Sequence, residues 1–157
     1  MREITLPLTG GCQCGQVRYE ITAAPVTHYC CHCTECQAQS ASAFGISLIV
    51  DAEAIRLQGK TASYVRDKGK RTEIEGFFCP DCGTRFIHRS NAQPADVSIK
   101  GGSLDNPDQL TPVGHIWTKS KRDWLELPAG SLQYDTEPDD DFAALEEAFQ
   151  AQHAFKA

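Results

Sequence analysis

Seven residues, Cys30-Cys31-His32-Cys33-Thr34-Glu35-Cys36, hold half of the eight cysteines in this 157-residue chain. Two further groups flank them along the sequence, Cys12-Gln13-Cys14 and Cys79-Pro80-Asp81-Cys82-Gly83. Thiols with one or two residues between them can reach the sulfur separations of a tetrahedral zinc site, roughly 3.8 Å for Zn–S bonds of about 2.3 Å. The glycine after Cys82 also suits the tight turn of a metal-binding knuckle. The clustering therefore predicts that bound metal organises the fold.

Other uses of paired cysteines fit this sequence less well. Structural disulfides belong mainly to secreted proteins, and the residues Met1–Leu8 contain no apolar run long enough for a signal peptide. We therefore expect a reduced, cytoplasmic protein. A redox C-x-x-C usually lies in a βαβ setting, which this strand-rich chain lacks.

Spacing alone leaves open which cysteines share an ion. One candidate is a zinc ribbon made from the pairs Cys33/Cys36 and Cys79/Cys82, although 42 residues separate the pairs and the usual separation is about 15–20. The number of ligands favours another division, with two zinc ions per chain. A closed structural site would take four thiols: Cys12, Cys14, Cys79 and Cys82. A site with one open position, as in catalytic zinc sites, would take three: Cys31, Cys33 and Cys36.

Composition and charge restrict the remaining possibilities. Hydrophobic residues make up 41% of the chain and charged residues 23%, which is typical of one folded domain of ordinary size. The formal net charge of −6 argues against nucleic acid as a partner, because phosphate contacts need a basic surface. No apolar stretch approaches the roughly 18 residues of a membrane span, so no membrane partner is expected.

The body of the chain predicts short strands separated by glycine and proline. Gln16–Ile21 alternates polar and apolar residues, as a half-buried strand does. Five further runs are strand-like: 26–29, 44–50, 71–78, 84–88 and 97–100. Tyr64–Arg66 and Thr72–Phe78 flank a turn and predict a hairpin. The basic runs 68–71 and 119–122 are interpreted as a solvated turn and a solvated loop.

Helix is expected in two places. One or two turns are predicted after Cys33. A clearer helix is predicted after the acidic run 139–141, because Phe142, Leu145 and Phe149 recur at helical spacing. We therefore expect a zinc domain over residues 1–135, followed by an acidic helical tail over 136–157 that docks on the body or on a partner subunit.

The cysteine clusters and the segments around them resemble the glutathione-dependent formaldehyde-activating enzyme family, which shares its domain with centromere protein V. The segments that carry the resemblance are Gly11-Cys12-Gln13-Cys14-Gly15-Gln16-Val17-Arg18-Tyr19, Cys31-His32-Cys33-Thr34-Glu35-Cys36, Ser42-Ala43-Phe44-Gly45, Phe78-Cys79-Pro80-Asp81-Cys82-Gly83, Ile99-Lys100-Gly101-Gly102-Ser103-Leu104, and His115-Ile116-Trp117 through Trp124. The sequence departs from the family at Gln37-Ala38, where a basic residue is common.

The resemblance implies a mainly β fold of the β-tent (Mss4-like) type, stabilised by zinc. It also implies that Cys12, Cys14, Cys79 and Cys82 hold a structural zinc, and that Cys31, Cys33 and Cys36 hold a catalytic-type zinc. The implied activity is that of a carbon–sulfur lyase, with S-(hydroxymethyl)glutathione formed from glutathione and formaldehyde. The implied partner is thus a small thiol such as glutathione. A non-catalytic, zinc-stabilised binding module is the alternative, and the acidic tail disfavours it.

Several residues near the clusters permit two interpretations. Cys30 is interpreted as a core or supporting thiol rather than a metal ligand. The ring of His32 is expected to point away from the metal, and Glu35 is interpreted as an exposed carboxylate rather than a proton relay or fourth ligand. His115 and Trp117 share one face of a predicted strand, where they either line the pocket or belong to the core.

Overall fold

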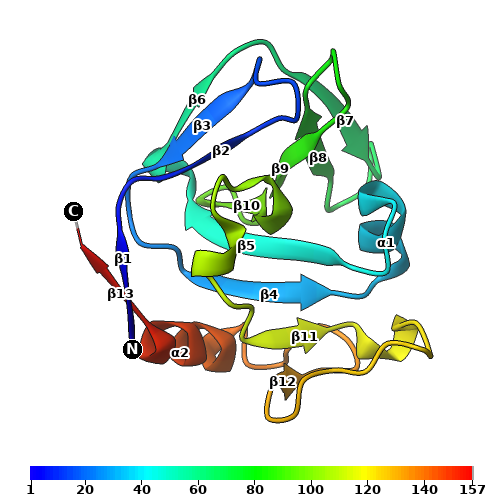
Figure 1. Cartoon of the computed structure of the whole chain (residues 1–157). Coiled ribbons are helices and arrows are strands. Elements are labelled where there is room, and N and C mark those ends of the chain that lie inside the picture. Colours follow the sequence, from blue (N-terminus) through cyan, green and yellow to red (C-terminus); the bar gives the residue numbers. More distant parts are fainter. Residues whose placement is uncertain (157) are drawn as a thin grey trace.

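Strands make up most of the regular secondary structure in this computed structural model, which describes residues 1–156 (Figure 1). Eight of them form a large sheet in the spatial order β12-β11-β4-β5-β10-β9-β8-β7. Their bounds are β4 (Thr27–Cys31), β5 (Gly45–Asp51), β7 (Ala62–Arg66), β8 (Ile74–Phe78), β9 (Arg85–Ser90), β10 (Asp96–Lys100), β11 (Gly114–Ile116) and β12 (Leu132–Gln133). Neighbouring strands are antiparallel, except that β11 is parallel to both β4 and β12.

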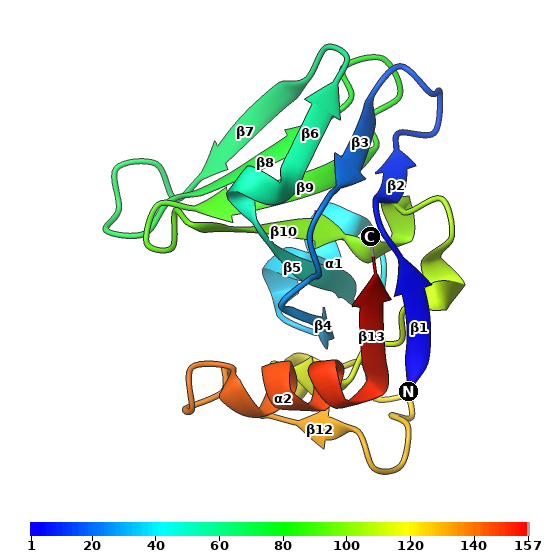
Figure 2. The same cartoon turned by 90° about the vertical axis from the view of Figure 1, so that its left-hand side faces the viewer.

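A second, three-stranded sheet covers part of the large one. It consists of β2 (Leu8–Gly11), β3 (Arg18–Ile21) and β6 (Ile55–Gln58), with β3 in the middle. Figure 2 shows this sheet in front of β8 and β9. Tyr19 and Ile21 on β3 are buried while Arg18 and Glu20, which alternate with them, are only half-buried, so one face of the strand supplies the core. The Tyr19 ring stacks on Phe86 of the large sheet, with ring centroids 6.4 Å apart.

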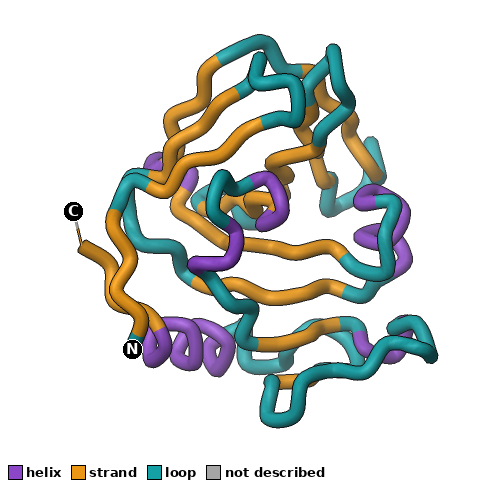
Figure 3. Tube along the Cα trace, in the orientation of Figure 1, coloured by secondary structure: helices purple, strands orange, loops and turns teal. Residues whose placement is uncertain are grey.

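The two helices lie at opposite ends of the β4–β5 pair (Figure 3). They are α1 (Thr34–Ser40), between β4 and β5, and α2 (Ala143–Gln152), near the C-terminus. Single 3₁₀ turns are found at Ala52–Ala54, Gly101–Ser103, Pro107–Gln109 and Thr118–Ser120. No helix within residues 1–156 is both long enough and apolar enough to cross a membrane.

The C-terminal segment packs onto the body. Leu145 and Phe149 of α2 are fully buried, and the hydroxyl of Thr27 on β4 donates a hydrogen bond to the Leu145 carbonyl at 3.0 Å. Gly114 lies directly under Leu145, where a Cβ would collide with the leucine side chain. After α2, β13 (His153–Lys156) pairs in parallel with β1 (Arg2–Thr5), so that the first and last strands lie side by side (Figure 2).

The mainly β character and the short C-terminal helix are confirmed. All six predicted strands are present with shifted ends, and β7 and β8 form the predicted hairpin. The strands that the sequence did not predict are β1, β2, β6, β12 and β13. The division at residue 135 stays a prediction, and the tail within the described residues adds a strand to its helix. Residue 157, the last of that tail, lies outside the described residues.

A buried histidine makes the fold sensitive to acid. His28 on β4 is 3% exposed, and neither of its ring nitrogens has a hydrogen-bond partner. Burial, and next the nearby His153, lower the pKa of His28 to about 4. The unfolded chain therefore takes up a proton below about pH 6.5, whereas the folded chain does so only near pH 4.

We expect the free energy of unfolding to fall by about 3 kcal/mol on this account as the pH drops from 6.5 to 4, at ~1.4 kcal/mol per unit of pKa shift. Urea denaturation across this range should show a steeper loss for the wild type than for His28→Leu. Loss of metal in acid affects both proteins, so the difference between them isolates His28. Parallel pH profiles would contradict the assignment.

Candidate metal centres and the cleft beside them

Four of the predicted ligands meet where the two sheets are joined. The sulfurs of Cys12, Cys14, Cys79 and Cys82 all lie within 4.8 Å of one another. Cys14 Sγ is 3.5 Å from Cys12 Sγ and 3.7 Å from Cys79 Sγ. These separations are far longer than the roughly 2.05 Å of a disulfide and close to the roughly 3.8 Å between thiolates on a tetrahedral zinc. The four thiols therefore fit a closed zinc site.

The first of its two loops follows β2. Cys12 N donates to the Val17 carbonyl at 3.0 Å, and Val17 N donates to Cys12 Sγ at 3.1 Å. Gly15 N donates to the Cys12 carbonyl at 3.0 Å, with Gly15 in the left-handed region at φ +82°. This turn folds Cys14 back toward Cys12 because glycine adopts that conformation without steric cost.

The second loop follows β8 and is closed in the same way. Gly83, at φ +75°, donates its N–H to the Cys79 carbonyl at 2.9 Å, and Cys79 N donates to the Thr84 carbonyl at 3.0 Å. The Thr84 hydroxyl lies 3.3 Å from Cys82 Sγ and accepts a hydrogen bond from Gln13 N at 3.1 Å. Thr84 thus ties the two loops together.

The remaining three predicted ligands meet at the start of α1. Cys31 ends β4, Cys33 is the N-cap of α1, and Cys36 lies one turn into the helix. Their sulfurs lie within 4.8 Å of one another, and Cys36 N donates to Cys33 Sγ at 3.3 Å. Gly45 on β5 leaves room for the Cys36 side chain, since a Cβ on residue 45 would lie only 3.2 Å from the Cβ of Cys36. The zinc-ribbon pairing of Cys33/Cys36 with Cys79/Cys82 is wrong, because the two groups are separate.

The three clustered thiols shift one another's pKa values. Hydrogen bonding with Cys31, and next with Cys36, lowers the pKa of Cys33 to about 2. Hydrogen bonding to Cys33, and next to Cys36, raises the pKa of Cys31. One thiolate is thus stabilised at the expense of another, since like charges this close repel. A divalent cation would let all three thiols ionise, so the donor set fits zinc.

Side-chain amides hold this knuckle in place. Gln37 is buried, and its Nε2 donates to the His32 carbonyl at 2.7 Å and to the Ser120 carbonyl at 2.8 Å. Gln39 Nε2 donates to Cys36 Sγ at 3.5 Å. Gln37 thus ties α1 to the 118–120 turn.

The structure places His32 and His115 beside the three thiols but outside their cluster. His32 Nε2 lies 3.0 Å from His115 Nδ1, and its ring packs against Phe44. Trp117 follows β11 in a left-handed conformation, is half-buried, and has Lys119 Nζ 4.8 Å from its ring centroid.

Cys30 and Glu35 also lie outside the thiol cluster. Cys30 is 4% exposed, and burial raises its pKa to about 12, which makes its thiol unreactive at neutral pH. The exposed Glu35 carboxylate accepts a hydrogen bond from Arg66 at 3.2 Å.

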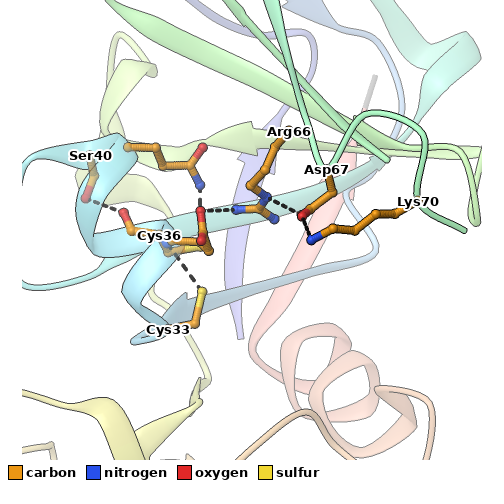
Figure 4. Close-up of polar contacts among 8 residues, drawn as sticks. Cys33, Cys36, Ser40, Arg66, Asp67 and Lys70 are labelled. Carbon is orange, nitrogen blue, oxygen red and sulfur yellow. Dashed lines mark hydrogen bonds and ion pairs between the residues drawn. The ribbon is translucent and has the colours of Figure 1, made fainter. Parts of the chain in front are cut away.

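A cleft of about 260 Å³ opens beside α1, on the side that faces β7 and β8. Its lining comprises Glu35, Ala38, Gln39, Tyr64, Arg66, Ile74, Gly76 and Arg85. Figure 4 shows Arg66 extending from β7 toward the helix that carries Cys33 and Cys36. No motif in the sequence marks this cleft or its two arginines.

The fold and the thiols define a small, mainly β protein with two separate cysteine clusters, one of four residues and one of three. A family model described as "Glutathione-dependent formaldehyde-activating enzyme" matches residues 7–120, and the chain belongs to this family. A crystal structure of a Rhodobacter sphaeroides protein is similar in fold, with 18% identity and a TM-score of 0.54. That similarity covers 81% of this chain and 99% of the other.

Proposed function

We propose that the chain is a zinc-dependent enzyme that joins a small thiol to an aldehyde through a new carbon–sulfur bond. Glutathione and formaldehyde are the expected substrates, since the family's activity is glutathione-dependent formaldehyde activation. The observation that carries the proposal is the contrast between the two clusters. Four thiols can fill the coordination shell of zinc, whereas the three at α1 leave one position for a substrate.

Cys12, Cys14, Cys79 and Cys82 would hold the structural ion. Cys12 and Cys14 follow β2 of the small sheet, and Cys79 and Cys82 follow β8 of the large one. The ion would therefore cross-link the two sheets, which is how zinc would stabilise a β-tent over residues 1–135.

Cys31, Cys33 and Cys36 would hold the second ion. Zinc bound there would lower the pKa of an added thiol, so that the substrate sulfur is a thiolate at neutral pH. The chain's own groups support negative charge at the sulfurs: Cys33 Sγ accepts from Cys36 N, and Cys36 Sγ accepts from Gln39 Nε2. Lys100 Nζ is buried without a hydrogen-bond partner, and burial lowers the pKa of Lys100 to about 8, while attraction to Cys36 acts in the opposite direction and favours its charged form.

The carbon–sulfur bond would form by attack of the thiolate on the carbonyl carbon of formaldehyde. The carbonyl π electrons move to oxygen, which takes a proton, so the step balances without an oxidant or reductant. The cleft of about 260 Å³ beside α1 has room for a small molecule, which favours an enzyme over a binding module. A cytoplasmic location and the absence of nucleic-acid partners stay predictions from the sequence.

One pair of variants tests this proposal. Cys33→Ala should carry one zinc ion instead of two by native mass spectrometry and should lose the acceleration of S-(hydroxymethyl)glutathione formation over the uncatalysed rate. Cys30→Ala removes a neighbouring buried thiol outside the cluster and should keep both ions and the activity. A wild type that binds two ions without accelerating the reaction would refute the enzyme. A single ion would refute the division into two sites.

A further inference from the structure

Arg85 is an uncompensated cation in the cleft wall. It lies at the start of β9, and its Nε is buried without a hydrogen-bond partner. Within residues 1–156 no carboxylate lies within ion-pair distance of it, whereas the cleft's other arginine, Arg66, pairs with Glu35 and Asp67. Arg85 as a whole is half-buried, but its Nε is shielded from solvent, so a cation without an ion-pair partner here favours binding of an anion.

The fold holds the Arg85 guanidinium in this position. Gly76 on β8 lies beneath it, and a Cβ on Gly76 would collide with Arg85 Nη2. Glycine weakens a strand interior relative to other residues, yet here its lack of a side chain lets the guanidinium lie against the sheet. Both residues line the cleft.

None of the three cysteines lines the cleft, but α1 carries residues of both the cleft and the three-thiol cluster. Gln39 lines the cleft and also donates to Cys36 Sγ at 3.5 Å. Arg66 in turn reaches α1 through its ion pair with Glu35. Figure 4 shows Arg66 on the side of α1 where Cys33 and Cys36 lie. A molecule whose sulfur lies at the cluster would have to extend along α1, past Gln39, to reach Arg85.

We propose that Arg85 is the anchor for a carboxylate of the thiol substrate, and that the enzyme therefore selects thiols that carry a carboxylate over neutral ones. This inference rests on the proposed function, since it assumes that a substrate sulfur binds at Cys31, Cys33 and Cys36. Arg85 is suited to the role because a guanidinium can bind a carboxylate through two parallel hydrogen bonds.

The test uses the zinc-loaded full chain and a series of mercaptocarboxylates of increasing length, from mercaptoacetate to 6-mercaptohexanoate, each paired with its neutral amide. Calorimetry should show that at least one acid binds about tenfold more tightly than its amide, as expected for a charge-assisted pair. Arg85→Gln should abolish this preference. So should Gly76→Ala, which displaces the guanidinium without removing its charge.

Arg89→Gln is the matched control. Arg89 lies on the same strand but is paired with Glu75 and is absent from the cleft lining, so its loss changes net charge equally and should leave the preference intact. Equal binding of acids and amides at every length, or an unchanged preference in Arg85→Gln, would overturn the inference while leaving the proposed function in place.

A second measurement separates the anchor from the thiol site. Propionate, which has no thiol, should shift the Arg85 Nε–Hε resonance in nuclear magnetic resonance spectra, and propionamide should not. If propionate shifts Arg85 and no thiol binds at all, the anion site stands and the proposed function fails. If propionate leaves Arg85 unchanged, the anchor itself is refuted.

Discussion

Replacing Cys79 with serine is expected to unfold the protein, whereas replacing Cys33 with serine should leave it folded. Cys79 is fully buried and belongs to the cluster that joins the loops after β2 and β8. Structural zinc supplies on the order of 10 kcal/mol of folding free energy in small zinc modules. Since a typical domain is stable by only about 5–15 kcal/mol, loss of that ion should remove most of the stability.

The measurement is thermal unfolding followed by circular dichroism on purified, zinc-loaded protein. Cys79→Ser should already be unfolded at 25 °C and should show no cooperative transition on heating. Cys82→Ser should behave in the same way. Cys33→Ser should keep the transition and lose one ion, because its cluster lies at one end of α1 rather than between sheets. Cys30→Ala controls for the loss of a buried thiol. Equal destabilisation by Cys33→Ser and Cys79→Ser would contradict the division into structural and functional sites.

The grouping of the cysteines could be predicted in part because some of the information is local. Cys31, Cys33 and Cys36 lie within six residues, so a single turn and the start of α1 bring them together. The helix of the tail is similarly visible in the spacing of Leu145 and Phe149. Which clusters share an ion is not local, because it depends on how β2 and β8 meet in space. The spacing therefore left the zinc ribbon open until the family resemblance was considered.

The cleft and the edge strands could not be predicted for the same reason. Arg66 and Arg85 lie on different strands, and pairing through β8 brings them to one wall of the cleft. Neither arginine belongs to a motif that could have marked it. β1 and β13 are four residues each and pair only with each other, so neither shows a pattern long enough to identify alone. β2 ends in Gly10 and Gly11, which are unfavourable in strands.

Cobalt substitution can report directly whether a thiol binds at Cys31, Cys33 and Cys36. Cobalt takes the same cysteine ligands as zinc, and each added sulfur ligand strengthens a charge-transfer absorption that oxygen ligands do not give. Glutathione should strengthen this band and release a proton, whereas S-methylglutathione, which has no free thiol, should change it little. Cys33→Ala should abolish the response, and Cys30→Ala should retain it. An unchanged spectrum on adding glutathione and other small thiols to the wild type would contradict the account.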